Sequence, residues 1–267
     1  TDNIIISAFI GLNWVGLLSN FNLIVEAVTG VLTQITGAIQ ASLGNYFAKE
    51  DRESGYRLFC KVDFLNYWLY GFFAIALDVL LNPFIVLWIG DAYTLSTGIV
   101  AAIAVNFFVA GFMNTLWTFR SALGLFTQGQ FRPLIVAALN IVLSVTLGKI
   151  FGVAGVLGAT SLSRACVNLW YDPWLLHRYG FQKSVKGFYL QWMFRLSILI
   201  GVGATMNLLS GIVFSGGVSI QKFCIMTFLV ALIPNAVLLA VFHRCDEFRY
   251  FKGICADWIL HNRCSSS

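Results

Sequence analysis

The feature that most constrains this chain is a succession of apolar stretches, each close in length to a membrane-spanning helix. A helix needs about 20 apolar residues to cross the hydrocarbon core of a bilayer. Eight segments approach or exceed that length: 4–18, 23–47, 64–89, 95–126, 133–151, 153–176, 187–214 and 218–242. The sequence therefore predicts an all-α, polytopic membrane helix bundle with about eight transmembrane helices.

The composition agrees with a membrane protein and argues against a nucleic-acid partner. Only 11% of the 267 residues are charged and 58% are hydrophobic, whereas about 25% of an ordinary soluble domain is charged. The net charge is +5, but the 17 basic residues are spread along an apolar chain. They form no dense basic patch of the kind that DNA binding requires.

The basic residues instead follow a topological pattern. If the segments alternate across the membrane, one side holds Lys49, Arg52, Arg57, Lys61, Arg132, Arg178, Lys183, Lys186, Arg244, Arg249, Lys252 and Arg263. The other side holds only Lys149 and Lys222. Because cytoplasmic loops carry the Lys and Arg excess, we predict a multi-pass protein of the cell membrane with a cytoplasmic C-terminus. Aromatic and basic residues mixed over 247–263 predict an amphipathic helix at that interface.

Motifs for catalysis or metal binding are lacking in the sequence. All three histidines, His177, His243 and His261, fall at or beyond the predicted cytoplasmic ends of segments. The six cysteines form no C-x-x-C pair, no serine lies in G-x-S-x-G, and no phosphate-binding G-x-x-x-x-G-K-[ST] occurs. We therefore expect no enzyme activity, no metal and no cofactor.

Ionisable residues inside apolar segments are then the main functional candidates, because they mark substrate or ion pathways in membrane proteins. Arg164 lies about 11 residues into a span of about 24, which places it near mid-depth. It is either a cationic contact for an anionic substrate or half of a salt bridge with a neighbouring helix. Arg120 and Arg195 lie closer to the interface, where snorkelling is favoured, and Arg120 is kept as a candidate cavity residue.

Three acids and one amide complete the candidates. Glu26 and Asp78 are deep enough to need a partner or a proton, so each is a candidate ion-coupling site or a partner for Arg164. Asp2 joins them if its helix continues upstream. Asn140 either donates a hydrogen bond to another helix, which we favour, or lines a cavity.

Four stretches together resemble a known family. They are TDNIIISAFIGLNWVGLLSNFNLI, LNPFIVLWIGDAYTLS, GLFTQGQFRPLIVAALNIVLSVTLGKIFGVAGVLGATSLSR and WYDPWLLHRYGF. In order and spacing they resemble the C-terminal part of polysaccharide-repeat (O-antigen type) flippases, whose superfamily includes the multidrug MATE transporters and the lipid II flippase. The resemblance rests on apolar and glycine positions, so it points to a family but not to one substrate.

The resemblance implies helices seven to fourteen of a fourteen-helix transporter. Residues 1–176 would be the C-terminal six-helix lobe, beginning inside its first helix with Gly11 to Gly16 as an outer turn and without the N-terminal lobe. Residues 177–267 would be two added transmembrane helices and the cytoplasmic amphipathic tail. The implied activity is flipping of undecaprenyl-diphosphate-linked oligosaccharide from the cytoplasmic to the outer leaflet by alternating access. The implied partners are that lipid-linked oligosaccharide, the lipid bilayer, a coupling cation (proton or sodium) and polysaccharide-assembly proteins.

Three alternatives stay open. A MATE-like ion-coupled multidrug exporter is expected to carry acids in its pocket more than arginines. A membrane-embedded polysaccharide-assembly enzyme is expected to have a large charged outer loop, whereas the outer loops here are short. A purely structural membrane protein would tolerate neutralisation of Arg164 and Glu26 together.

Overall fold

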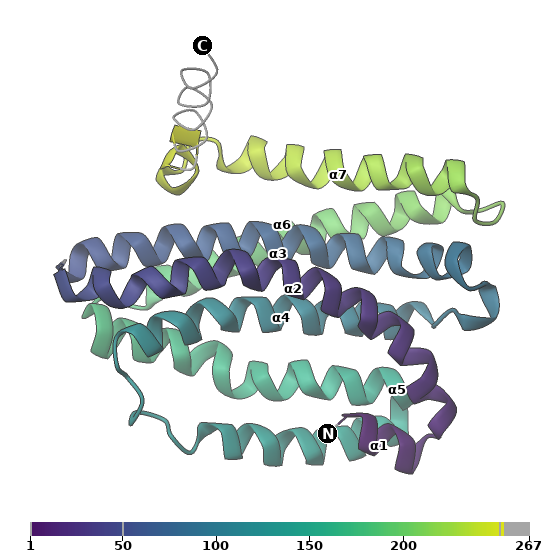
Figure 1. The fold of residues 1–267 in the computed structure, drawn as a ribbon, viewed down its shortest axis with the longest axis horizontal. Helices are drawn as coiled ribbons and strands as arrows, with labels where there is room; N and C mark the ends of the chain where they lie inside the picture. Colours follow the sequence, from purple (N-terminus) through teal and green to yellow (C-terminus); the bar gives the residue numbers. More distant parts are fainter. Residues whose placement is uncertain (1, 50, 251, 254–267) are drawn as a thin grey trace.

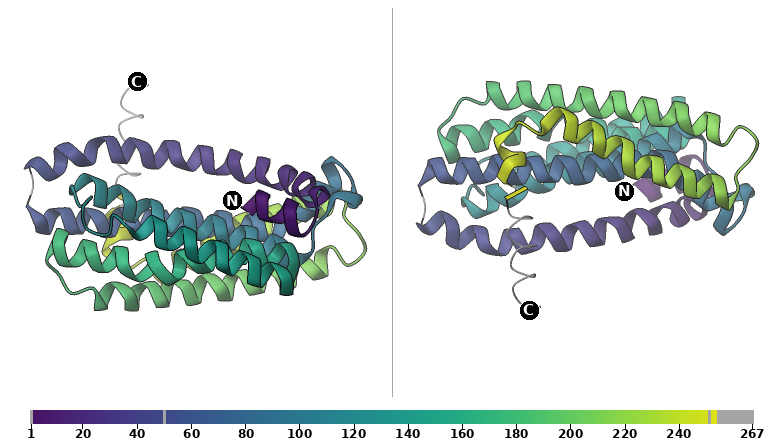
Figure 2. Two further views of the ribbon diagram at one scale, coloured as in Figure 1. Left: turned by 90° about the horizontal axis from the view of Figure 1, so that it is seen from below. Right: turned by 90° about the horizontal axis from the view of Figure 1, so that it is seen from above.

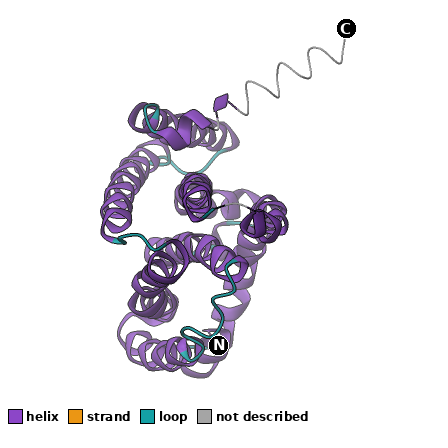
Figure 3. Cartoon of the chain, turned by 90° about the vertical axis from the view of Figure 1, so that its left-hand side faces the viewer, coloured by secondary structure: helices purple, strands orange, loops and turns teal. Residues whose placement is uncertain are grey.

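The structure is a computed structural model that describes residues 2–49, 51–250 and 252–253. Helices run the length of the molecule and loops join them at its two ends (Figures 1 and 3). The elements in order are α1 (Asp2–Phe9), α2 (Leu12–Lys49), α3 (Arg52–Trp88), η1 (Asp91–Tyr93), α4 (Thr97–Ala122), α5 (Arg132–Leu175), the π-helix η2 (Leu176–Phe181), α6 (Lys186–Val213) and α7 (Ile220–Phe242). The prediction of an all-α polytopic bundle is confirmed.

Six helices in the described part of the chain are long and apolar enough to cross a membrane, so the predicted number of about eight is not confirmed. One difference is at the N-terminal end, where the expected segment 4–18 is divided by a turn at Gly11 (φ 139°). The eight residues of α1 are too few to span a bilayer. The other difference is that segments 133–151 and 153–176 are the two legs of the single element α5.

The chain reverses inside α5 at Gly152, whose φ of 61° and ψ of −139° lie outside the helical region (Figure 1). Glycine adopts such angles without the steric penalty of a Cβ atom. The legs approach closely beside the turn, because a Cβ added to Gly155 would lie 2.1 Å from the carbonyl oxygen of Leu147. The bend lies between the predicted segments 133–151 and 153–176, with one glycine making the bend and another permitting the contact.

The junction between α2 and α3 is shorter than the predicted gap between segments 23–47 and 64–89. Asp51 caps α3, since its carboxylate accepts a 2.9 Å hydrogen bond from the backbone nitrogen of Ser54. Ser, Thr, Asp and Asn are the residues that satisfy free N–H groups at helix starts. As a result α3 begins at Arg52, about three turns before the predicted start at residue 64.

All the strongly basic junctions gather at one end of the bundle (Figure 1). The α2–α3, α4–α5 and α5–α6 junctions and the end of α7 lie there, whereas Lys149 and Lys222 lie near the opposite end. This arrangement is the alternation on which the topology prediction rests. Arg263 and most of the predicted amphipathic tail lie outside the described residues. The compartment faced by each end stays a prediction.

Helix α3 is central and packs against α2, α4, α6 and α7, while α2 and α6 border opposite sides of the bundle (Figure 2). The α3–α6 contact contains a buried ion pair, in which a guanidinium nitrogen of Arg195 lies 2.7 Å from a carboxylate oxygen of Asp63. Tyr67 also donates a 2.8 Å hydrogen bond to the carbonyl of Arg195. The interpretation of Arg195 as a snorkelling residue is therefore wrong. The predicted domain boundary between residues 176 and 177 stays a prediction.

Candidate functional site

A polar cleft lies among α1, α2, α4 and the two legs of α5. It consists of two adjoining pockets of about 440 and 580 Å³ that share Asp2, Asn3, Thr160 and Arg164. Its polar side chains come from five segments of the chain: Asp2, Asn3, Asn22, Thr29, Thr33, Asn106, Asn114, Arg132, Asn140, Thr160, Ser163, Arg164 and Asn168. So many hydrogen-bonding groups around one cleft are unusual in an apolar bundle, because each is costly to place in hydrocarbon.

Arg164 occupies the junction of the two pockets, on the second leg of α5. Its half-buried side chain has no hydrogen-bond or ion-pair partner within the described residues. An arginine at the centre of a membrane helix is unfavourable by about 2.5–3.5 kcal/mol on insertion scales. Neither Glu26 nor Asp78 pairs with it, so the guanidinium keeps all of its donors available to a ligand or to water in the cleft.

A chain of hydrogen bonds crosses the cleft beside Arg164. The side-chain nitrogen of Asn140 donates to the Thr160 hydroxyl over 3.0 Å, and that hydroxyl donates to the Asp2 carboxylate over 2.8 Å. Because Thr160 precedes Arg164 by one helical turn on the same face, the acid and the guanidinium line one cavity without forming an ion pair. The favoured prediction for Asn140, a hydrogen bond between helices, is confirmed, here between the two legs of α5.

Thr160, which joins two predicted residues, was not among the predicted site residues. Its position one turn before an intramembrane arginine was the available signal. Asn106 was missed as well: its side-chain nitrogen donates to the carbonyl of Leu157 over 2.8 Å, and the Ser161 hydroxyl donates to its side-chain oxygen. These amide and hydroxyl contacts fix α4 against the second leg of α5, which positions Arg164.

Arg120 lies outside the lining of both pockets and is only 6% exposed, so its interpretation as a snorkelling residue is wrong. Its Nε donates to the carbonyl of Leu125 over 2.8 Å, and another guanidinium nitrogen donates to the carbonyl of Gln128. Asp172 lies 3.6 Å from it and also pairs with Arg132. Arg120 therefore fixes the α4–α5 loop, and its role in substrate binding stays a prediction.

Arg132 is the cation of this cluster that does line the cleft. Its partner Asp172 lies two turns of α5 beyond Arg164, and the pair is at the basic end of the bundle. By the 1.5 Å rise per residue, the eight residues from Arg164 to Asp172 span about 12 Å along the helix. The cleft thus has one cation close to its end and another deeper within it.

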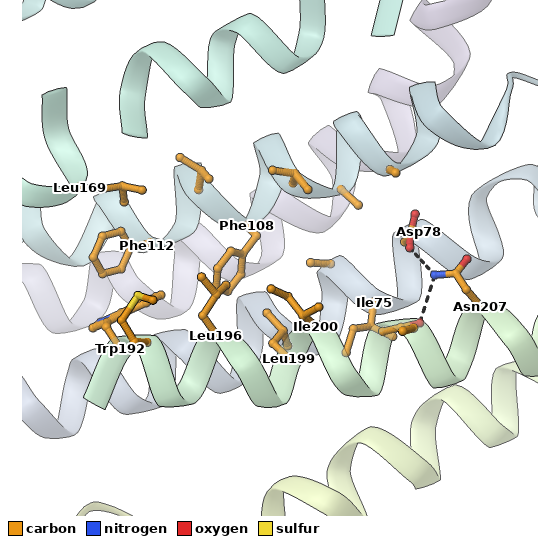
Figure 4. A pocket seen from close by; sticks show the side chains of 18 of the residues that line it. Ile75, Asp78, Phe108, Phe112, Leu169, Trp192, Leu196, Leu199, Ile200 and Asn207 are labelled. Atoms are coloured by element: carbon orange, nitrogen blue, oxygen red, sulfur yellow. Dashed lines mark hydrogen bonds between the residues drawn. The ribbon is translucent and has the colours of Figure 1, made fainter. Parts of the chain in front are cut away.

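Asp78 belongs to a different site. It lines an apolar groove of about 830 Å³ bordered by α3, α4, α5 and α6, where the Asn207 side chain donates a 2.6 Å hydrogen bond to it (Figure 4). Its second carboxylate oxygen is buried without a partner among the described residues. Glu26 is exposed on α2, one turn after Asn22 and at the edge of the face that lines the cleft. Neither acid joins the Asp2–Arg164 site.

No protein-family model, curated protein or solved structure matches this chain. The described residues also include no group of three or more His, Cys, Asp or Glu side chains that could hold a metal ion. The site is therefore defined by its own geometry: an unpaired guanidinium and a hydrogen-bonded carboxylate in one polar cleft of a multi-pass membrane protein.

Proposed function

We propose that this chain is part of a transporter that moves an undecaprenyl-diphosphate-linked oligosaccharide from the cytoplasmic to the outer leaflet of the cell membrane. The observation that carries the proposal is Arg164, an unpaired guanidinium inside a polar cleft. The resemblance of the sequence to polysaccharide-repeat flippases supports the same conclusion. The protein then acts in cell-surface polysaccharide biosynthesis as a transporter, not as an assembly enzyme.

The chemistry of the cleft suits such a substrate. A diphosphate is favoured by guanidinium groups, which donate paired, charge-assisted hydrogen bonds to its oxygens. Asparagine and threonine side chains around the two pockets offer donors and acceptors to sugar hydroxyls. The two pockets together offer a polar group hydrogen-bonding side chains that hydrocarbon lacks, and Arg132, which is paired with Asp172, is a second cation toward one end.

Asp2 is the best candidate for ion coupling. Its carboxylate lines the same cleft as Arg164 and is hydrogen-bonded to Thr160 at 2.8 Å. Binding of a proton or sodium ion to this carboxylate would change the charge beside the guanidinium. In an alternating-access cycle an ion acts by stabilising one of the two states, so the change in charge would favour either loading or release of the diphosphate.

The test is complementation of a flippase-null strain by the complete reading frame that carries this chain. Arg164→Ala is expected to abolish surface polysaccharide, while Arg164→Lys retains part of it because the charge remains but the paired donors are lost. Arg57→Ala, at an exposed position of α3, is the matched control and is expected to complement fully. Wild-type polysaccharide from Arg164→Ala at normal membrane abundance would refute the proposed role.

One observation favours a multidrug exporter as a second candidate. Asp78, one of whose buried carboxylate oxygens has no partner in the part of the chain that the structure describes, lines an apolar groove suited to a lipophilic cation. If the protein is an exporter, Asp78→Asn raises the sensitivity of cells to lipophilic cations and Arg164→Ala does not. The flippase proposal expects the opposite pattern, with a polysaccharide defect in Arg164→Ala and unchanged drug sensitivity in Asp78→Asn.

A further inference from the structure

The corner between α5 and α6 contains a basic pocket of about 460 Å³, apart from the cleft described above. Three cationic side chains line it, Arg178, Lys183 and Lys186, together with the hydroxyl of Ser184. None of the described residues that line this pocket is acidic. Its charge is therefore positive, and it lies at the end of the bundle where the other basic junctions gather (Figure 1).

Two of the three cations have no acidic partner within the described part of the chain. Lys183 is paired, since its ammonium nitrogen lies 2.7 Å from a carboxylate oxygen of Glu53. Arg178 instead lies over aromatic rings, 5.8 Å from the ring centroid of Trp174 and 5.9 Å from that of Tyr179. Both Arg178 and Lys186 are exposed. The pocket thus offers two uncompensated positive charges to an anion.

A buried histidine, His177, also belongs to the lining of this pocket. His177 is 1% exposed, and its Nδ1 lies 2.7 Å from the carbonyl oxygen of Pro173. Its Nε2 is buried without a hydrogen-bond partner among the described residues. Its ring packs among the aromatic rings of Tyr56, Phe59, Phe181 and Phe188, so the histidine links the pocket lining to the aromatic core at this end of the bundle.

The basic pocket adjoins the apolar groove shown in Figure 4. Phe188 lines that groove, and its ring centroid lies 5.1 Å from that of His177 in the basic pocket. Tyr189 also lines the groove and donates a hydrogen bond to the carbonyl of Trp170. The residues that line a cationic pocket at the end of the helices are therefore in contact with residues that line an apolar groove between them, an arrangement that matches the two parts of a lipid.

We propose that this corner binds an anionic phospholipid, with its phosphate between Arg178 and Lys186 and one acyl chain along the groove. Basic pockets between transmembrane helices recognise anionic head groups in this way. The continuity with the groove favours a lipid over a soluble phosphate. This site does not depend on what the cleft transports, because it shares no residue with the Asp2–Arg164 pockets.

The test is a native mass spectrometry titration of the purified, delipidated protein with dioleoyl phosphatidylglycerol and, separately, dioleoyl phosphatidylcholine. The variant is Arg178→Gln with Lys186→Gln, which removes two exposed charges that form no ion pair among the described residues. The matched control is Arg57→Gln with Arg244→Gln, two exposed basic residues at the same end of the bundle. Inorganic phosphate and undecaprenyl phosphate are titrated as competitors.

The wild-type protein is expected to bind phosphatidylglycerol more tightly than phosphatidylcholine. The pocket variant should lose about 25-fold in affinity for phosphatidylglycerol, about fivefold for each charge, without a change for phosphatidylcholine. An equal loss in the control variant would overturn the proposal, because it would show only a general surface potential. Displacement by millimolar inorganic phosphate would assign the pocket to a soluble anion. Tighter binding of undecaprenyl phosphate would assign it to the transported lipid, and either result refutes a phospholipid site.

Discussion

Replacing Asp63 by asparagine would leave the guanidinium of Arg195 buried between α3 and α6 without its carboxylate. The two side chains are 3% and 6% exposed, and their charged atoms are 2.7 Å apart. The Trp192 indole donates a further 3.4 Å hydrogen bond to the same carboxylate. Breaking a buried pair by removing one partner destabilises a protein by about 3–5 kcal/mol, because the remaining charge is uncompensated.

We expect a loss at the lower end of this range, because Arg195 keeps part of its surroundings in the variant. Asparagine keeps an oxygen that accepts a hydrogen bond, and Arg195 still lies over the rings of Phe64 and Tyr67, 5.3 and 5.6 Å from their centroids. Cation–π contacts of this kind contribute about 0.5–2 kcal/mol. We therefore expect Asp63→Asn to lower the free energy of unfolding by about 3 kcal/mol, which corresponds to a decrease in Tm of about 6–12 °C for a chain of this size.

The assay is thermal unfolding in detergent of the wild type, Asp63→Asn, Arg195→Met and the double variant Asp63→Leu with Arg195→Met. Both single variants should be strongly destabilised. The double variant should recover most of the stability, because replacing a whole buried pair by apolar side chains is often neutral. A loss below about 1 kcal/mol in the single variants, or no recovery in the double variant, would refute the role assigned to the pair.

Three further predictions concern other parts of the molecule. Gly155→Ala should lower the free energy of unfolding by about 1–3 kcal/mol, because the added methyl group would overpack against the Leu147 carbonyl. Gly158→Ala, with open space around it, should not lower it. Equal Tm values for the two variants would contradict the close contact. Thr160→Val should reduce surface polysaccharide by breaking the Asn140–Thr160–Asp2 chain, while Thr146→Val, which loses bonds only within its own helix, should not. Hydrogen bonds from Ser54 hold the pKa of Asp51 below its ordinary value. The cap therefore stabilises α3 at pH values above the unfolded-state pKa, and this stabilisation is lost as the pH falls through the lower folded-state pKa. Hydrogen exchange at the Ser54 amide should accelerate over that acidic range, and in Asp51→Ala, relative to uncapped reference amides; unchanged protection would argue against the cap.

Local patterns were enough to predict the class of fold and several of its details. Apolar segment length predicted the membrane helices, and the distribution of Lys and Arg predicted which junctions share an end of the bundle. The division between segments 133–151 and 153–176 predicted the place of the bend inside α5, where Gly152 adopts backbone angles that a residue with a Cβ atom disfavours. Segment limits were less accurate, since the cap at Asp51 extends α3 into a charged stretch that hydropathy assigns to a loop.

The pairing of charged and polar groups was decided only by the tertiary structure. Asp63 and Arg195 are 132 positions apart, and Asp2 and Thr160 are 158 apart, so no local spacing relates them. Arg120 and Arg195 were assigned to the interface by distance from helix ends, yet both are buried because particular neighbours supply carbonyls or a carboxylate. A sequence determines where charges lie along each helix, but the packing of the helices determines which charges meet. For that reason Arg164 was identified from the sequence, whereas only the fold established that no side chain among the described residues pairs with it.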